Sequence, residues 1–311
     1  MSFIKEKLPA TREEWLEGRK KGIGGSDAGV ILGLNAWKSP YMLWCEKTGR
    51  IKKDYDNEAM RQGRDLEAYV AERFTELTGK KVRRSGYSFQ SVEHPFMLAN
   101  VDRLIVGEKA GLECKTTNML NKTDYAGGDV PPTYYAQCQH YMAVTGLDKW
   151  YIAVLVLSKD FYVLEIERNE EYIETMITYE EDFWELVTSD QEPAIDGSES
   201  TEEALKALYP DANDDTIDLI GVDDVIDLLA TTNQKIKEFR TIKRKCESEL
   251  KQQLGQNCSG RTDKAYVNWK QRKKTSIDTE LLKKEYPDVY KKCMKQSTYR
   301  QFGIKEVKNG S

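Results

Sequence analysis

The 311-residue sequence predicts an α/β protein with a mixed central sheet flanked by helices, followed by a basic, mainly helical extension. One observation is the order of hydrophobic patterns after residue 60, which runs helix, hairpin, helix, strand, strand, helix. The other is charge. Residues 231–311 hold 21 Lys/Arg and 9 Asp/Glu, a net of +12, whereas residues 190–230 hold 1 and 13, a net of −12. We therefore expect a domain over 1–189, an acidic linker over 190–222 and a basic module over 223–311.

The N-terminal region combines a short helix with a glycine-rich turn. Residues 11–14 form a capping-box pattern that predicts a helix ending near Arg19. The glycines within residues 22–25 allow a tight turn, and Ser26 is the expected N-cap of the next helix. A helix N-terminus attracts anions, and the Arg19 guanidinium suits phosphate. A simple capped loop is the commoner meaning of such a string. A dinucleotide site is excluded because no strand precedes the glycines.

Two helices follow this turn. Ser39 is an expected N-cap and Pro40 suits a first helical turn, so a helix begins there. Residues 61–78 then repeat apolar side chains at helical spacing, and Gly79 suits the C-terminal stop. Glu67 lies in this second helix, beside its apolar stripe. Such a charged residue is normally only solvated, but this helix leads directly into the next motif.

The most informative pattern is a β-hairpin that carries Asp102 and, eleven residues later, Glu113-Cys114-Lys115. Because alternate residues of a strand share a face, Glu113 and Lys115 point the same way and Cys114 points to the other side. Carboxylate oxygens suit Mg²⁺ or Mn²⁺, and a neighbouring lysine can position and help deprotonate a water molecule. The plainer alternative is a solvated set of cross-strand charges.

The elements after the hairpin complete the expected sheet. Thr133 is a candidate N-cap and Gly146 a C-terminal stop for one more helix, in which Gln137 and Tyr141 share a face. The sequences of residues 150–157 and 161–168 are typical of strands.

The basic module begins with a long helical pattern over residues 223–254, whose apolar side chains form one broad stripe. Residues 264–270 alternate as a strand, a further helix begins near residue 277, and residues 299–305 are expected to close the module as a strand. Basic residues mixed with aromatic ones suit a DNA backbone. A solvated charged helical hairpin, or docking of a partner, remains an alternative.

Taken together, the segments from Trp15 to about Val187 resemble the phage λ exonuclease and YqaJ-type viral recombinase nucleases, a branch of the PD-(D/E)xK superfamily. The motifs that carry this resemblance are Arg19 with Gly22–Ala28, Gly63–Glu67, Asn100–Asp102, Glu113–Lys115 and Tyr135–Gln139. Val101 stands where the superfamily name has proline, a position without chemistry. The Arg that follows the catalytic Lys in the λ enzyme is replaced by Asn121-Lys122, which puts that DNA contact in doubt.

The resemblance implies a metal site and assigns its residues. Asp102 and Glu113 would hold Mg²⁺, or Mn²⁺ as a substitute, together with the backbone carbonyl of Cys114. Glu67 would complete the site directly or through water. Lys115 would orient and activate the attacking water, and no covalent intermediate is needed.

The resemblance also implies that Gln137 belongs to the catalytic set and that Arg19 and Ser26 grip the 5′-phosphate of DNA. The implied enzyme is a 5′→3′ double-strand DNA exonuclease of a phage or prophage recombination system. It would supply 3′ single-stranded tails to an annealing protein of RecT/Redβ type, and the λ-like enzymes imply a homo-oligomeric ring around duplex DNA. Alternatives are an endonuclease or single-strand nuclease with the same site, and a non-catalytic DNA-binding protein.

Composition bounds the cellular setting. The six cysteines are scattered without C-x-x-C spacing, which fits reduced thiols and argues against zinc or an iron–sulfur cluster. The N-terminus does not resemble a signal peptide, and the apolar runs are too short to span a bilayer. We expect a protein of the bacterial cytoplasm that does not enter the membrane.

Overall fold

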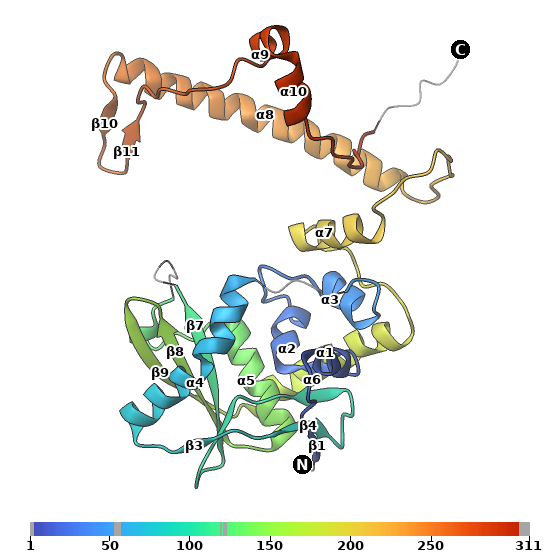
Figure 1. Ribbon diagram of the computed structural model, residues 1–311, viewed down its shortest axis with the longest axis vertical. Coiled ribbons are helices and arrows are strands. Elements are labelled where there is room, and N and C mark those ends of the chain that lie inside the picture. The colour runs from blue at the N-terminus through green and yellow to red at the C-terminus, as the bar shows by residue number, and fades with distance from the viewer. Residues whose placement is uncertain (1–2, 53–56, 119, 121–122, 305–311) are drawn as a thin grey trace. The chain divides into compact units, whose positions relative to one another are not determined.

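The structure is a computed structural model that describes residues 3–52, 57–118, 120 and 123–304 (Figure 1). Asn121-Lys122 therefore lie outside the described residues. The chain divides into two compact units, residues 1–210 (unit 1) and residues 211–311 (unit 2).

Unit 1 holds most of the regular structure. Its strands are β1 (Phe3–Lys7), β2 (Ile23–Gly24), β3 (Val82–Arg83), β4 (Tyr87–Ser91), β5 (Met97–Ala99), β6 (Arg103–Ile105), β7 (Ala110–Thr117), β8 (Lys149–Val156) and β9 (Asp160–Glu167). Its α-helices are α1 (Arg12–Arg19), α2 (Gly25–Ile31), α3 (Pro40–Lys47), α4 (Glu58–Thr78), α5 (Pro132–Thr145), α6 (Glu170–Thr188) and α7 (Glu199–Leu208). A single 3₁₀ turn, η1 (Tyr125–Gly127), precedes α5.

The central sheet is mixed, as expected. Its strand order is β3-β6-β7-β8-β9, with β7 parallel to β8 and the other neighbours antiparallel. A second sheet has the order β1-β4-β5-β2. The expected fold class is confirmed: α/β layers with helices on the sheet, and a mainly helical extension.

Alternation along β8 explains why helices cover both faces of the sheet. Tyr151 and Ala153 belong to a buried cluster with α4, which contributes Phe74. Trp150 and Ile152 belong to a second cluster with α5 (Figure 1). Successive side chains of a strand point to opposite faces, so a strand that is apolar throughout requires cover on both sides.

The helix ends follow the capping rules with two corrections. Thr11, Ser39, Gly79 and Gly146 cap their helices as expected, the two glycines in the left-handed conformation. The N-cap of α2, however, is Gly24 and not Ser26, which lies inside the first turn. The N-cap of α5 is Pro131 and not Thr133. Both helices begin before the hydroxyl residue that was expected to cap them. Helical backbone starts at Gly25 in α2 and at Pro132 in α5, so the residue before each becomes the N-cap.

The first part of the acidic segment 190–222 is packed against unit 1. Helix α7 contacts α3, and its Ala204 is fully buried. The Ser39 amide donates to Ser200 Oγ at 3.0 Å, and Thr201 Oγ1 donates to Ser39 Oγ at 2.9 Å. Residues 199–208 thus form a structural element of unit 1, with their acidic side chains on its outer side.

Unit 2 consists of the long helix α8 (Asp223–Leu254), the hairpin β10 (Ser259–Arg261) and β11 (Tyr266–Asn268), and the short helices α9 (Thr279–Glu285) and α10 (Pro287–Cys293). The long helix has the expected bounds, whereas the expected strand over 264–270 is only three residues long. The closing strand expected over 299–305 is not formed in its described part, residues 299–304. In the part of the chain that the structure describes, no helix combines the length and apolar character that crossing a membrane requires.

Candidate active site

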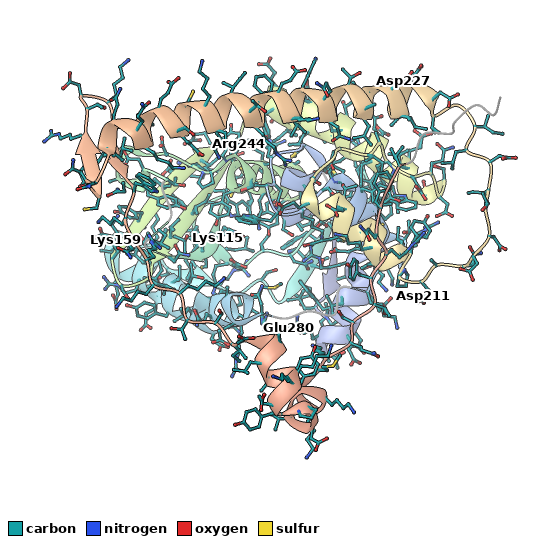
Figure 2. All side chains as sticks on the ribbon, turned by 90° about the horizontal axis from the view of Figure 1, so that it is seen from above. Lys115, Lys159, Asp211, Asp227, Arg244 and Glu280 are labelled. Atoms are coloured by element: carbon teal, nitrogen blue, oxygen red, sulfur yellow. The ribbon has the colours of Figure 1, made fainter. Side chains whose placement is uncertain are left out.

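The hairpin of β6 and β7 brings Asp102 and Glu113 to neighbouring strands. Asp102 lies just before β6, and its Oδ2 accepts a hydrogen bond of 2.8 Å from the backbone amide of Cys114. On β7, Lys115 Nζ lies 2.7 Å from Glu113 Oε1, which confirms that these two side chains share a face. Lys115 can be followed in Figure 2. The hairpin geometry alone therefore gathers the three residues that the sequence singled out.

Gln137 joins helix α5 to this cluster. Its Oε1 accepts from Lys115 Nζ at 2.8 Å, and its Nε2 donates to Glu113 Oε1 at 2.8 Å. The same Nε2 lies 2.8 Å from the hydroxyl oxygen of Tyr141, one helical turn on. Lys115 Nζ also lies 4.7 Å from the centre of the Tyr134 ring, within the range of a cation–π contact. The side chain of Gln137 therefore fixes the relative positions of Glu113 and Lys115.

The electrostatics of the cluster favour a cation. Burial, then the nearby Glu113 and Glu67 carboxylates, raise the pKa of Asp102 well above its usual range. Burial opposes the charged form of Lys115, but the Glu113 carboxylate outweighs it and raises the pKa of that ammonium. Glu113 itself is only 4% exposed, and its Oε2 is buried without a hydrogen-bond partner. An orphaned carboxylate oxygen beside a second, half-buried carboxylate fits a hard divalent cation.

Glu67 reaches the edge of this cluster from α4, but it is held by a residue that sequence reasoning missed. Its Oε1 pairs with Nη1 of Arg103, and that same nitrogen donates to the backbone carbonyl of Asp102 at 2.7 Å. Among the described residues, no three His, Cys, Asp or Glu side chains form a ready-made metal cluster. The carboxylates face Lys115 and Arg103 instead. Adjacency to Asp102 was the only signal for Arg103 in the sequence.

A second cluster brings Arg19 and Ser26 together. Arg19 Nη2 donates to Ser26 Oγ and to Asp27 Oδ1, each at 2.9 Å. Lys47 Nζ donates to the other oxygen of Asp27 at 2.7 Å and to the carbonyl of Gly22 at 2.6 Å. Burial disfavours the charged carboxylate, but Lys47 and Arg19 hold the pKa of Asp27 well below its usual range. No role for Asp27 or Lys47 was predicted from the sequence.

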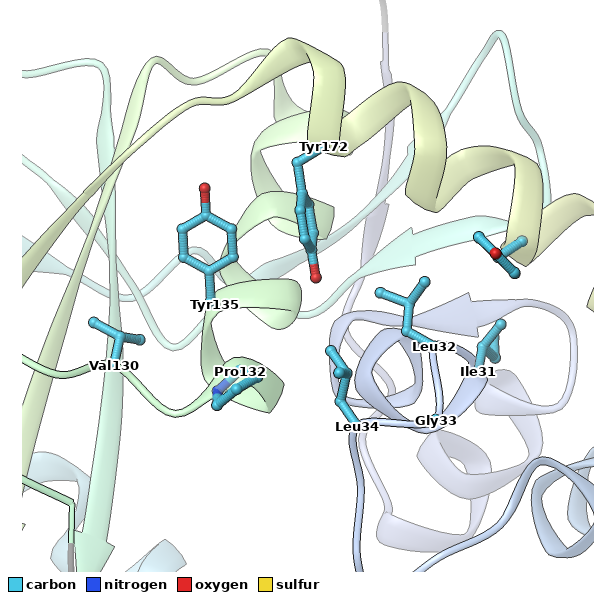
Figure 3. Close-up of a pocket in the computed structure, with 9 residues that line it drawn as sticks. Ile31, Leu32, Gly33, Leu34, Val130, Pro132, Tyr135 and Tyr172 are labelled. Carbon is cyan, nitrogen blue, oxygen red and sulfur yellow. The ribbon is translucent and has the colours of Figure 1, made fainter. Parts of the chain in front are cut away.

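This second cluster borders a cavity of about 450 Å³ that is rich in charged side chains. Its lining is mixed in charge, with the basic residues Arg19, Lys20, Lys47 and Lys52 and the acidic residues Glu13, Glu17, Asp27 and Glu46. A second cavity of unit 1, about 630 Å³, has a different lining: Tyr135 and Tyr172 meet edge to face beside residues 31–34 (Figure 3). No charged side chain is among its described lining residues, so the chemistry of the candidate site does not lie in this cavity.

Comparison with known proteins places this geometry in a family. A model of the YqaJ-like viral recombinase domain matches residues 14–148. The YqaJ protein of Bacillus subtilis (strain 168) is 42% identical over 303 residues, which cover 96% of this chain and 95% of that protein. The chain belongs to the YqaJ family. The matched residues 14–148 of this YqaJ-family chain contain both clusters described above, from Arg19 to Gln137.

Two solved structures are also similar to this YqaJ-family chain. The alkaline exonuclease LHK-Exo from Laribacter hongkongensis has a TM-score of 0.49 and 22% identity, covering 57% of this chain and 93% of that one. A phage related exonuclease from Haemophilus somnus 129PT has a TM-score of 0.41 and 13% identity, covering 54% of this chain and 96% of that one.

Proposed function

We propose that this protein is a divalent-metal-dependent deoxyribonuclease that degrades linear duplex DNA from its 5′ ends. The observation that carries the proposal is the Asp102–Glu113–Lys115 cluster, tied together by Gln137 in a chain of the YqaJ family. Two carboxylates with an ammonium on the same face have the chemistry needed for metal-assisted hydrolysis of a phosphodiester.

Asp102 and Glu113 would hold Mg²⁺, for which Mn²⁺ substitutes, with the Cys114 carbonyl and Glu67 as further ligands. The orphaned Glu113 Oε2 fits this assignment. When bound, the cation supplies charge neutralisation at the phosphate and at the leaving 3′ oxygen. To join the set, Glu67 must exchange its contact with Arg103 for one with the metal or a metal-bound water.

Lys115, held as an ammonium beside Glu113, orients and activates the attacking water through its charge, and the proton of that water passes to solvent. Gln137 orients Lys115 by accepting a hydrogen bond from its ammonium, and it anchors Glu113 by donating a hydrogen bond to its carboxylate. Because water is the nucleophile, no Ser or Cys is required, and hydrolysis leaves 5′-phosphorylated products.

Arg19 and Ser26 are proposed to bind the 5′-phosphate of a DNA end. Arg19 donates to Ser26 at 2.9 Å beside a cavity that Lys20, Lys47 and Lys52 also line, and the guanidinium and ammonium groups are suitable partners for phosphate. The basic module 223–311 is proposed to contact the DNA backbone, with residues 1–189 as the nuclease domain. Biologically, the enzyme would act in the bacterial cytoplasm as part of a phage or prophage recombination system. It would pass 3′ tails to a RecT/Redβ-type annealing protein and would assemble as a ring.

The polarity is tested with end-labelled linear duplexes that carry a 5′-phosphate or a 5′-hydroxyl, and with closed circles, all in Mg²⁺. We expect loss of the 5′-phosphorylated strand, slower loss with 5′-hydroxyl ends and no cutting of closed circles. Arg19→Ala should remove the preference for 5′-phosphate, whereas the outward-facing Arg61→Ala serves as the control. Cutting of closed circles would instead establish an endonuclease with the same site.

A further inference from the structure

Unit 2 carries a long apolar seam on α8 that the proposed nuclease chemistry does not use. Among the described residues of unit 2, Leu254 is the only buried apolar side chain. Ile236 and Phe239, at the middle of α8, are 41% and 67% exposed. A helix of 32 residues is about 48 Å long, so the apolar surface that the contacts within unit 2 leave uncovered is large.

The seam follows a heptad repeat, with alternating steps of four and three residues. Its positions, which we call the α8 seam, are Val225, Leu229, Thr232, Ile236, Phe239, Lys243, Cys246, Leu250 and Gln253. Six of these nine are apolar, and the pattern is sustained over four heptads. Such a repeat indicates pairing with another helix, because a spacing of 3.5 residues keeps one stripe facing a partner along its whole length.

The charges along α8 are divided between its two ends. Residues 223–234 hold three Asp and no Lys or Arg, a net of −3. Residues 243–254 hold four Lys or Arg and two Glu, a net of +2. Asp227 and Arg244 mark the acidic and basic parts in Figure 2. A second copy of α8 that runs in the opposite direction sets each acidic end against a basic end, and it also opposes the two helix dipoles.

The seam residues fit the same antiparallel arrangement. When the seams of two copies meet, their central layers pair Ile236 with Phe239, and the outer layers pair Leu229 with Cys246, Val225 with Leu250, and Thr232 with Lys243. Lys243 then faces the small polar Thr232. In a parallel pair Lys243 would face its own copy, and both acidic ends would meet, which like charges disfavour.

We propose that α8 pairs antiparallel with α8 of a second copy of this chain through the α8 seam. The occupant of the seam is therefore the protein itself. This inference does not depend on the nuclease proposal, because none of the seam residues belongs to the candidate active site.

The mass of the full-length protein in solution, measured by sedimentation equilibrium, tests the pairing. Ile236→Glu combined with Phe239→Glu should halve the mass relative to wild type. The matched control, Gln234→Glu combined with Thr241→Glu, adds the same charge on the opposite side of α8 and should leave the mass unchanged. A wild-type mass that the seam substitutions do not change would overturn the proposal. The same unchanged mass is expected if the seam packs within one chain or against another protein.

The direction is tested by cross-linking with a short bismaleimide, in full-length protein from which Cys258→Ser and Cys293→Ser remove two of the three exposed cysteines. The remaining exposed cysteine, Cys246, should give no dimer by itself. Adding Leu229→Cys should give a covalent dimer, because the two positions share a layer only in the antiparallel arrangement. A dimer linked through Cys246 alone would show a parallel pair and refute the direction proposed here. Absence of both products would refute the pairing itself.

Discussion

At the scale of single residues, Lys115 is held by three neighbouring side chains of the candidate site. Its Nζ faces Glu113 Oε1, Gln137 Oε1 and the ring of Tyr134, so its ammonium has one defined position. A lysine on a flexible four-carbon chain loses much rotamer freedom when it is held in this way. Such ordering is expected where a cation must lie at a fixed distance from a reacting water.

Gln137→Ala should lower turnover by roughly 10–100-fold, because the residue orients both Lys115 and Glu113 without touching the reacting atoms. The measurement is single-turnover hydrolysis of linear duplex in Mg²⁺, together with DNA affinity in Ca²⁺. We expect the affinity to stay within about threefold of wild type, which corresponds to less than 1 kcal/mol. Unchanged turnover would show that Gln137 has no positioning role.

His140 and Glu180 form a fully buried pair that links α5 to α6. His140 Nδ1 lies 2.8 Å from Glu180 Oε1, and Nε2 lies 3.0 Å from the carbonyl of Leu98. Both ring nitrogens thus face acceptors, which favours the doubly protonated imidazolium. Burial opposes this charge, but Glu180 outweighs the burial and raises the pKa of His140. The stabilisation from this pair is therefore present below the unfolded pKa of about 6.5 and is lost as pH rises through the folded pKa.

Glu180→Gln should lower the free energy of unfolding by about 3–5 kcal/mol at pH 6, because it removes one partner of a buried charge pair. The loss should shrink as pH rises, since the wild type gives up the same stabilisation when His140 deprotonates. Urea unfolding of both proteins between pH 6 and pH 9 measures this difference. A difference that stays constant with pH would contradict the charged pair.

At the scale of elements, two glycines on one face of α2 let this helix approach α5 closely. A Cβ at Gly25 would lie 2.5 Å from the ring of Tyr141, and one at Gly29 would lie 3.1 Å from the backbone of Thr133. Tyr141 in turn contacts Gln137 through its hydroxyl group. The close packing at Gly25 and Gly29 therefore places α2, which carries Ser26, directly against α5, which carries Gln137.

Gly25→Ala should destabilise unit 1 by about 1–3 kcal/mol through overpacking, and it should also reduce turnover by displacing Tyr141 and Gln137. Gly18→Ala is the matched control. A Cβ at Gly18 meets nothing within 4 Å, and alanine in a helix is favoured over glycine by about 0.5–1 kcal/mol. Thermal unfolding and duplex digestion measure both effects. Equal behaviour of the two variants would contradict the close packing of α2 on α5.

Local sequence patterns predicted which helices and strands form more accurately than they predicted where each helix begins. The α4 helix, the β6–β7 hairpin and the apolar β8 follow from periodicities of 3.6 and 2, which the final packing keeps. The predicted N-caps Ser26 and Thr133 were wrong because α2 and α5 begin two residues earlier than expected, with Gly24 and Pro131 as their N-caps. The sheet β1-β4-β5-β2 was not predicted, because short strands paired over long separations leave little local signal.

The same limit applies to the site. Asp102, Glu113 and Lys115 are close in sequence and share a hairpin, so their proximity was predictable. The contacts of Glu67 with Arg103 and of Lys47 with Asp27 join separate elements, and no periodicity reports them. Residues 299–304 fail to form a strand for a related reason: the sheet in the described part of unit 2 is the two-stranded hairpin of β10 and β11, and these residues pair with neither strand.

At the scale of the whole molecule, the hydrophobic core is concentrated in unit 1. All members of the three buried clusters lie within residues 1–210. Unit 2 contains mainly α8 and short elements, with little buried apolar surface of its own. Burial of apolar surface is the main favourable contribution to folding, so the two units should differ strongly in autonomous stability.

A fragment of residues 1–210 should therefore unfold cooperatively with a Tm within a few degrees of that of full-length protein. A fragment of residues 211–311 should show helical signal that fades gradually on heating at low concentration. Calorimetry and circular dichroism of the two fragments measure this contrast. A cooperative transition of the 211–311 fragment that does not depend on concentration would contradict our assignment of the core.

The most direct test of the central claim is digestion of linear duplex DNA in Mg²⁺ by wild type, Lys115→Ala and Asp102→Ala. Lys109→Ala, on the exposed turn of the same hairpin, is the matched control. The proposed site predicts metal-dependent hydrolysis by wild type and by Lys109→Ala, and a loss of at least about 10²-fold in the other two variants. Hydrolysis that persists in Lys115→Ala and Asp102→Ala, or none by wild type on any DNA, would contradict the assignment of this cluster as a nuclease active site.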